Sequence, residues 1–366
     1  MKILQLEVEG FRSLKHVVWK PGDLNVVIGP NASGKSNLLK VLEMLKAAAE
    51  GRLKRHVMRE GGMGSLVWDA KVEDIVFGLN LSEGVDYRLA LRRLGDSSSY
   101  GIASEECHDS LECREDELGI SSANFKGSKA KPNEETRLSQ QSSPRDERVG
   151  SYLASWGLYQ DFVTARGSVV RSDTIAMYES HVDPDGSNLI PTLHTLYTGN
   201  RSFKEDVNDA MAAAFGDDFD ELIFAPVADQ RIVMRVRWKS LATEQPAANL
   251  SDGTLRFLYL LAVLADPEPP GLIAIDEPET GLHPRMMALV AELAVHAARR
   301  TQVILTTHSS DFLDGFYKLG SPTVSVAENR GGETLLRVLE GEELQYWLKR
   351  YTLGDLFRTT ELEQME

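Results

Sequence analysis

A glycine-rich stretch, GPNASGKS at residues 29–36, follows the short apolar run LNVVI and constrains the fold more than any other feature. The pattern G-x-x-x-x-G-K-[ST] is typical of a loop that wraps around phosphates, because its glycines permit a tight turn and its backbone N–H groups point inward. Lys35 would neutralise the β- and γ-phosphates, and Ser36 would offer its hydroxyl to Mg²⁺. The candidate nucleotide-binding residues of this loop are Gly29, Pro30, Asn31, Ala32, Ser33, Gly34, Lys35 and Ser36.

The segments around this loop have the order that a phosphate-binding loop requires. Residues 24–28 read as a buried strand, and the pattern LLKVLEMLKAA after the loop has helical periodicity. Further along, apolar helices and buried strands alternate in the segments TLRFLYLLAVLA, LIAID, PRMMALVAELAVHAA and VILTTH. This alternation is typical of a parallel α/β sheet, so we predict a nucleoside triphosphate-binding protein of the α/β class.

Two further motifs bring carboxylates and an imidazole to strand ends. In LIAIDEPETGLHP an apolar strand delivers Asp276 and Glu277 to its carboxyl end, where open α/β sheets bind ligands. Asp276 would hold Mg²⁺, and Glu277 would polarise the water that attacks the γ-phosphate. In VILTTHS, His308 ends another buried strand and could donate to the γ-phosphate or to that water.

A fourth motif, LSDGTLRF at residues 250–257, places Ser251 and Gly253 at the start of an apolar helix. The exposed N–H groups and the positive dipole end of such a helix form an anion site, although an ordinary helix cap has the same residues. The helix after the phosphate-binding loop would already place its N-terminus at the γ-phosphate. A second helix N-terminus of the same chain could reach that phosphate only if the fold bent around it. We therefore expect this site to face a nucleotide held by another subunit.

Composition excludes several classes of protein. Acidic residues outnumber basic ones 55 to 40, and the net charge of -15 argues against a globally basic nucleic-acid binder. The two cysteines, Cys107 and Cys113, match neither a zinc nor a redox spacing and suggest a reducing compartment. No apolar run is long enough to span a bilayer, so we expect a cytoplasmic protein without a membrane partner.

Composition also divides the chain into segments. We expect a discontinuous core at residues 1–95 and 221–366, a polar and flexible insertion at 96–150, and a mainly helical lobe at 151–220. The segment RIVMRVRWK alternates cleanly between apolar and basic residues and predicts a strand. Its basic face is either a solvated surface or a contact for DNA, and a cluster near residue 55 has the same two interpretations. These candidate residues are Arg231, Arg235, Arg237 and Lys239 on the strand, and Arg52, Lys54, Arg55 and Arg59 in the cluster.

Together, the four motifs resemble those of the head domains of ABC-class ATPases of the RecF, SMC and OLD type, which belong to the AAA_21 kind of AAA-family ATPases. The segments VEGFRSL, DPDGSNL and LGDLF match as well, so the resemblance covers nearly the whole chain except about residues 96–150. It implies a P-loop NTPase of the ABC-ATPase head type, with a mixed sheet core and an inserted helical lobe.

The resemblance also implies roles for individual residues. ATP would be the substrate and Mg²⁺ the cofactor, and two copies of the chain would form an ATP-dependent homodimer around two nucleotides. The implied site consists of catalytic Glu277 and His308, metal-binding Ser36 and Asp276, the in-trans signature Ser251, Asp252 and Gly253, Arg12 near the nucleotide, and a D-loop over residues 279–283. A Q-loop glutamine is not assignable among Gln140, Gln141 and Gln160.

Several members of the class fit less well. Residues 37–249 hold no sustained heptads, which argues against the long coiled-coil arms of SMC proteins. The segment after His308 is too short for the TOPRIM nuclease of OLD proteins, so any nuclease or other effector would be a separate chain. A role in DNA repair or anti-phage defence follows only by analogy. There are two alternatives. One is a nucleotide switch with little turnover. The other is the ATPase subunit of a transporter, against which the GFRSL and GLHP segments and the missing Q-loop pattern argue.

Overall fold

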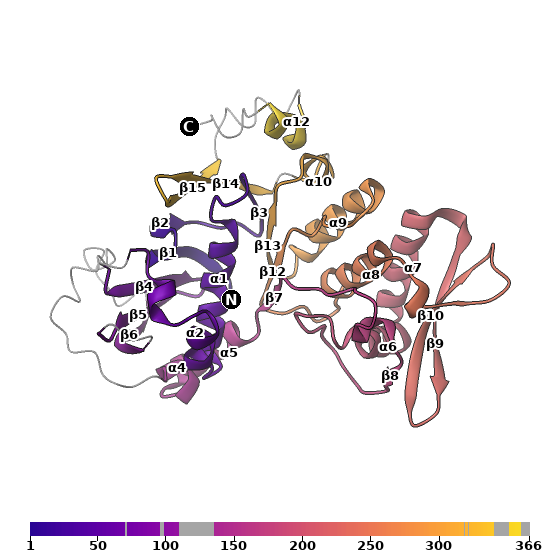
Figure 1. The fold of residues 1–366 in the computed structure, drawn as a ribbon, viewed down its shortest axis with the longest axis horizontal. Helices are drawn as coiled ribbons and strands as arrows, with labels where there is room; N and C mark the ends of the chain where they lie inside the picture. Colours follow the sequence, from indigo (N-terminus) through magenta and orange to yellow (C-terminus); the bar gives the residue numbers. More distant parts are fainter. Residues whose placement is uncertain are drawn as a thin grey trace. The chain divides into compact units, whose positions relative to one another are not determined.

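The computed structural model describes residues 1–69, 72–95, 99–109, 135–317, 319–320, 322–339 and 351–359. The chain divides into two compact units, and each of them combines stretches that are far apart in the sequence. Unit 1 contains residues 1–158, 323–344 and 365–366, and unit 2 contains residues 159–322 and 345–364. Figure 1 labels the elements along the chain.

Unit 1 contains a five-stranded antiparallel sheet in the order β2-β1-β4-β5-β6. Its strands are β1 (Ile3–Phe11), β2 (Leu14–Trp19), β4 (Asp74–Leu81), β5 (Val85–Arg93) and β6 (Tyr100–Asp109). Alternate residues of the strands, such as Leu6, Val8 and Phe77, are fully buried. The residues between them, such as Glu7 and Glu9, lie on the opposite face and remain partly accessible.

The phosphate-binding loop of unit 1 lies between a buried strand and a helix, as predicted. β3 (Leu24–Ile28) precedes the loop and pairs in parallel with β14 (Thr323–Arg330), which pairs antiparallel with β15 (Glu333–Leu339). α1 (Lys35–Ala49) begins directly after Gly34 and buries ten of its side chains, most of them apolar. The helices α2 (Leu53–Arg59) and α3 (Met63–Leu66) follow it.

Part of the range for which we predicted a flexible insertion is regular structure. It contains β6, α4 (Arg137–Gln140) and most of α5 (Pro144–Ala154), which is followed by β7 (Gly157–Tyr159). β6 is polar in sequence, but an edge strand needs only backbone pairing with β5 on one side. α5 has a proline in its first turn and an N-cap, Ser143, that accepts from the Asp146 N–H. Residues 96–98 and 110–134, including Cys113, lie outside the described residues.

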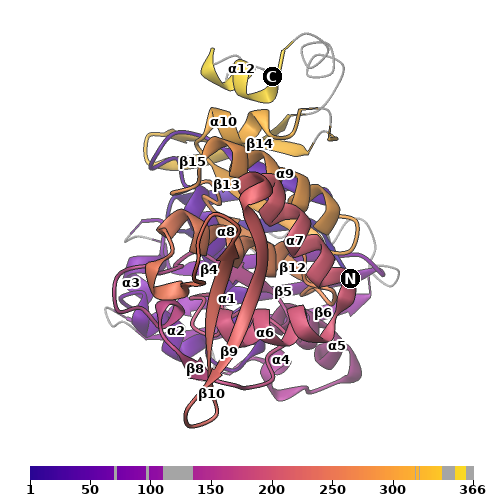
Figure 2. The ribbon, with the colours of Figure 1, turned by 90° about the vertical axis from the view of Figure 1, so that its right-hand side faces the viewer.

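Unit 2 contains a small antiparallel sheet beside two helices. β10 (Arg231–Trp238) pairs with β8 (Thr174–Ile175), β9 (Phe219–Val227) and β11 (Gln245–Pro246). The alternating burial along β10 confirms the strand predicted there. α6 (Leu189–Gly199) and α7 (Arg201–Phe215) lie within the range 151–220, where we predicted a helical lobe, and Figure 2 shows α7 beside the β9–β10 hairpin. Three short 3₁₀ turns lie at Val169–Arg171, Gly216–Asp218 and Ala247–Asn249.

The remainder of unit 2 carries the motif-bearing strands. α8 (Asp252–Leu264) leads to β12 (Leu272–Asp276), which pairs in parallel with β13 (Gln302–Thr307). α9 (Pro284–Ala297) connects these two strands. α10 (Ser310–Asp314) follows β13, and α12 (Leu353–Arg358) holds the LGDLF segment. Within the described residues, the helices are all too short or too polar to cross a bilayer.

Candidate functional site

The phosphate-binding loop has a wrapped backbone that only glycine can adopt at two positions. Gly29 has a φ of 150° and Gly34 a φ of 102°. A Cβ on Gly29 would lie 2.2 Å from the carbonyl oxygen of Ala327, and a Cβ on Gly34 would lie 2.0 Å from Oγ1 of Thr334. Both contacts are far below van der Waals separation, so a side chain at either position would force the loop to move.

Lys35 lies at the centre of this loop. Its Nζ donates to the carbonyl oxygens of Gly29 and Pro30 at 2.7 and 3.1 Å, and the residue is only 6% exposed. Ser33 Oγ is also buried, and it has no hydrogen-bond partner among the described residues. A buried hydroxyl without a partner is unfavourable in water-free surroundings. The loop therefore has one ammonium and one hydroxyl that an anionic ligand could satisfy.

Three side chains outside the motif brace the loop, and sequence reasoning missed them. Thr334 of β15 donates to the carbonyl oxygen of Ser33 at 2.9 Å. Its Oγ1 lies 2.6 Å from Ser13 Oγ, which also accepts from the side-chain amide of Asn37 at 2.7 Å. Ser13 belongs to the GFRSL segment, whereas Thr334 has no motif that would single it out.

Arg12, which we expected near a nucleotide, contacts Glu60. Its Nη2 lies 2.5 Å from Glu60 Oε2, which also accepts from Lys40 Nζ at 2.8 Å. Arg12 has a φ of 49°, a conformation that costs a non-glycine residue about 1–3 kcal/mol. The surrounding turn holds this strained backbone through a bond from the Arg12 N–H to the carbonyl oxygen of Leu66 at 2.7 Å.

In unit 2, the acidic pair at the end of β12 is held by β13. The hydroxyl of Thr306 donates to Asp276 Oδ1, and the backbone N–H of Glu277 donates to the carbonyl oxygen of Thr306 at 3.1 Å. Glu277 has a φ of 46°, which is again a strained conformation for a non-glycine residue. This turn begins directly after Asp276, which is the last residue of β12.

The imidazole of His308 lies between two glutamates. Its Nδ1 is 2.8 Å from Glu277 Oε1 and 4.0 Å from Glu279 Oε1. Glu279 is 5% exposed and accepts from the Thr307 hydroxyl at 2.5 Å, and burial raises the pKa of its carboxyl. The strand ends of β12 and β13 thus bring Glu277 and His308 into direct contact.

Arg256 of α8 supports the backbone of Glu277 and was not anticipated from the sequence. Its Nη2 donates to the carbonyl oxygen of Glu277 at 3.0 Å. The guanidinium is largely buried, and burial lowers the pKa of Arg256. Its position in the LSDGTLRF segment is the one signal that could have drawn attention to it.

The LSDG segment forms the start of α8. Ser251 is the N-cap and accepts from the Thr254 N–H at 3.1 Å. A Cβ on Gly253 would lie 2.8 Å from the carbonyl oxygen of Gly281, so the absence of a side chain lets α8 begin against the D-loop segment. The D-loop segment ends at His283, which is the N-cap of α9.

Arg171 holds the LSDG segment from a distant part of unit 2. Its side chain is 11% exposed, and Nη1 donates to the carbonyl oxygens of Ala248 and Leu250 at 3.2 and 2.7 Å. Its Nη2 lies 2.5 Å from Asp252 Oδ1. Hydrogen bonds from Thr164 and Arg171 lower the pKa of the Asp252 carboxyl. The isolated arginine in SVVR gave no sequence signal of this role.

We expect Arg171→Gln to reduce any ATP turnover by about ten- to a hundredfold, since small misplacements of binding groups cost up to this much. The affinity for ATP at the phosphate-binding loop should remain unchanged, because Arg171 contacts only residues of unit 2. Steady-state kinetics and fluorescent-nucleotide titration measure the two quantities. Arg166→Gln removes an exposed arginine nearby and is the matched control. Equal turnover in both variants would contradict the role of Arg171.

The basic strand face is largely neutralised by carboxylates. Arg231 pairs with Asp173, Arg235 lies 3.6 Å from Glu244, and Arg237 lies 2.5 Å from Glu221. Arg52 of the second basic cluster pairs with Glu50. Three of the four basic residues predicted on the strand therefore already have acidic partners, and Lys239 is the exposed fourth. The contact with DNA remains a prediction.

Comparison with known proteins places the chain in a family. The model of the family AAA_21, described as "AAA domain, putative AbiEii toxin, Type IV TA system", matches residues 24–314. The chain belongs to this family. The match includes the phosphate-binding loop, the LSDG segment, the acidic pair and His308, and it confirms the predicted resemblance.

Solved structures show the same fold. The SMC head bound to the C-terminal winged-helix domain of ScpA is similar over 94% of this chain and all of its own, with 15% identity and a TM-score of 0.57. An SMC head with an extended coiled coil, bound to the C-terminal domain of ScpA derived from Pyrococcus furiosus, covers 95% of this chain and 98% of its own length, with 13% identity and a TM-score of 0.53. The predicted fold class, a P-loop NTPase of the ABC-ATPase head type, is thus confirmed.

One curated protein matches a short segment of the chain. Structural maintenance of chromosomes protein 1 of Arabidopsis thaliana is 41% identical over 61 residues. These residues are 16% of this chain and 5% of that protein. The AAA_21 protein thus has the fold of SMC head domains, and it spans only a small part of this curated relative.

Proposed function

We propose that the protein binds and hydrolyses ATP, and that ATP joins two copies of the chain. The observation that carries this proposal is the pair of Glu277 and His308, whose side chains lie 2.8 Å apart after two parallel strands. A general base needs a second group that orients it, and an imidazole against a carboxylate supplies one. The strained backbone of Glu277 also fits a functional role, because strain is retained where the surrounding structure requires a particular side-chain direction.

The residues of the phosphate-binding loop fit ATP and Mg²⁺. Glycines at 29 and 34 let the loop wrap closely against Ala327 and Thr334, and the buried hydroxyl of Ser33, without a partner among the described residues, lies in the same loop. Ser36 and Asp276 offer a hydroxyl and a carboxylate, the hard oxygen ligands that Mg²⁺ prefers. We propose that both hold the ion, which would neutralise charge on the phosphates.

In the proposed reaction, Lys35 exchanges its bonds to the carbonyl oxygens of Gly29 and Pro30 for phosphate oxygens. Glu277 accepts a proton from the attacking water, and His308 orients the Glu277 carboxylate and donates to the γ-phosphate. Arg256 keeps the Glu277 backbone in place through its bond to the Glu277 carbonyl oxygen. Each of these groups acts mainly by position and charge, as phosphoryl transfer requires.

The proposed dimer uses the LSDG segment of one copy to complete the site of the other. Ser251 and Asp252 are both exposed at the N-terminus of α8, where the dipole favours an anion. The Ser251 hydroxyl, Asp252 and the Gly253 backbone would face the γ-phosphate held by the partner copy. Asp252 is acidic, but its bond to Arg171 offsets this charge.

We expect ATP turnover to rise faster than linearly with protein concentration, because two copies are needed for each complete site. The test is steady-state hydrolysis over a range of concentrations, together with mass measurement by light scattering in ATP and Mg²⁺. A dimeric mass that appears only with ATP would support the proposal. Linear turnover from a monomer would contradict the in-trans role of the LSDG segment.

A second, finer proposal is that ATP binding gates a DNA-related process such as repair or anti-phage defence, with a separate nuclease or other effector chain in the cytoplasm. It rests on the resemblance and on the family description alone. Normal ATP binding with no turnover would favour the alternative of a nucleotide switch. Co-purification with a membrane protein would favour the alternative of a transporter subunit.

A further inference from the structure

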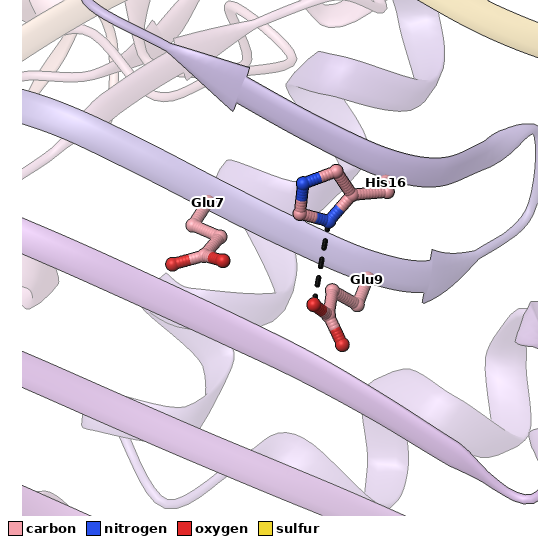
Figure 3. A group of neighbouring side chains, drawn as sticks. All are labelled: Glu7, Glu9 and His16. Carbon is pink, nitrogen blue, oxygen red and sulfur yellow. Dashed lines mark ion pairs between the residues drawn. The ribbon is translucent and has the colours of Figure 1, made fainter. Parts of the chain in front are cut away.

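A group of potential metal ligands lies on the polar face of the five-stranded sheet in unit 1. Glu7 and Glu9 are two residues apart in β1 and therefore project from the same face of the strand. His16 of β2 lies directly opposite Glu9 in the antiparallel register. Figure 3 shows the three side chains together, with a dashed contact between the His16 ring and Glu9.

The distances suit a small divalent cation. His16 Nδ1 lies 3.3 Å from Glu9 Oε1, and one donor atom of each of the three residues lies within 4.8 Å of the others. A tetrahedral ion with bonds of about 2.0–2.2 Å spaces its ligands roughly 3.4 Å apart. The pair of His16 and Glu9 already has this spacing, and the Glu7 carboxylate lies within 4.8 Å of both.

The sheet also leaves room beside Glu7 for further ligands. Gly78 lies opposite Glu7 in β4 and has no side chain to cover it. A hollow of about 170 Å³ opens there, with Glu7, Gly78, Asp86 and Arg88 among its lining residues. Of the three proposed ligands only Glu7 lines this hollow, so it gives water or an exogenous ligand access to the Glu7 side of the site.

We propose that Glu7, Glu9 and His16 form a binding site for a divalent cation of the zinc type. One imidazole with two carboxylates favours zinc, cobalt or nickel over magnesium, which prefers oxygen ligands only. Arg88 interacts electrostatically with Glu7 and offsets part of the charge of the two carboxylates. Arg88 cannot bridge the three side chains. Only a metal ion would be bound by Glu7, Glu9 and His16 together.

A second group of this kind, Glu43, His56 and Glu60, does not support such a site. Glu60 already accepts from Arg12 and Lys40, so its charge is neutralised by two cations. A metal ion at that position would be repelled by both side chains. The group on the sheet is therefore the stronger candidate among the described residues.

A cation at the proposed site would join β1 to β2 close to their connecting turn. The turn contains Ser13, whose hydroxyl bonds to Asn37 and contacts Thr334, both of which brace the phosphate-binding loop. Binding to the folded state alone raises stability by mass action. We therefore expect Zn²⁺ to raise the Tm of the nucleotide-free protein by several degrees, without any need for ATP.

The test is calorimetric titration of the full chain with Zn²⁺ in excess Mg²⁺, repeated with Co²⁺ and its visible absorption spectrum. We expect His16→Gln and Glu9→Gln each to weaken the binding of one equivalent of Zn²⁺ by roughly tenfold or more. Even the loss of an indirect partner of a metal lowers its affinity about 10–100-fold. The Co²⁺ bands and the rise in Tm should be lost with it. His16 is half exposed, so its replacement should leave the fold intact.

The matched control is His108→Gln. His108 lies 3.4 Å from Glu106 on β6 of the same sheet, and it is an exposed histidine that belongs to no group of three potential metal ligands among the described residues. This variant should bind Zn²⁺ like the unmodified protein. The proposal is overturned if His16→Gln and Glu9→Gln retain the same Zn²⁺ stoichiometry and affinity, or if His108→Gln loses as much as they do.

Discussion

Replacing Glu277 with glutamine should lower the rate of ATP hydrolysis by about a hundredfold or more, the amount that a positioned general base contributes. Glutamine has the same shape and can keep the contact with His308, but its amide cannot accept a proton from water. The backbone of residue 277 should be unchanged, because the carbonyl oxygen still accepts from Arg256 and the N–H still donates to Thr306. ATP affinity should therefore be retained.

The expected product of this change is a stable ATP-bound dimer. If hydrolysis releases the two copies, a variant that binds ATP without cleaving it should remain dimeric in ATP and Mg²⁺. Steady-state phosphate release, nucleotide titration and light scattering measure the three properties. Glu292→Gln makes the same change in charge at an exposed position of α9 and serves as the control.

Two results would oppose this interpretation. Turnover by Glu277→Gln at the rate of the Glu292→Gln control would mean that Glu277 is not the base. Loss of both ATP binding and turnover would assign Glu277 a structural role. Its strained backbone and its bond to His308 would then only hold the ends of β12 and β13. Thermal unfolding without nucleotide separates this case from a general loss of folding.

The elements around the phosphate-binding loop could be predicted from sequence because their signals are local. LNVVI is a continuous apolar run, and the helix after Lys35 has its own periodicity. The same holds for β10, whose alternation appears directly in its burial. The strand ends at Asp276 and His308 were also predictable, because apolar runs of strand length precede both residues.

The supporting contacts could not be predicted, because they join residues with no local pattern. Ser13 and Thr334 are 321 residues apart, and Arg171 reaches Leu250 over 79 residues. An arginine in a polar loop has no sequence feature that distinguishes a buried brace from a solvated side chain. β6 was missed for a related reason, since an edge strand can be polar and is stabilised by its backbone pairing to β5.

Gly34→Ala should weaken ATP binding by about a hundredfold, because it changes both the backbone and the packing of the loop. Alanine at a φ of 102° is strained, and forcing a side chain into such a conformation costs about 1 kcal/mol or more. Its Cβ would also lie 2.0 Å from Thr334 Oγ1 and 2.9 Å from Thr334 Cβ. Rotation of the threonine relieves only the first contact, so the loop itself must move.

Gly84→Ala carries only the first of these effects, the backbone strain, and serves as the control. Gly84 has a φ of 71° in unit 1, but nothing lies within 4 Å of its Cβ position, so alanine there adds backbone strain without a clash. Fluorescent-nucleotide titration of both variants, with thermal unfolding as a check of folding, measures the difference. If Gly84→Ala binds ATP normally and Gly34→Ala does not, the loss of binding comes from the wrapped loop beside Thr334 and not from glycine replacement in unit 1 as such. If Gly34→Ala binds ATP as tightly as Gly84→Ala does, the wrapped loop is not the phosphate site, and the ATP-binding proposal fails at its first step.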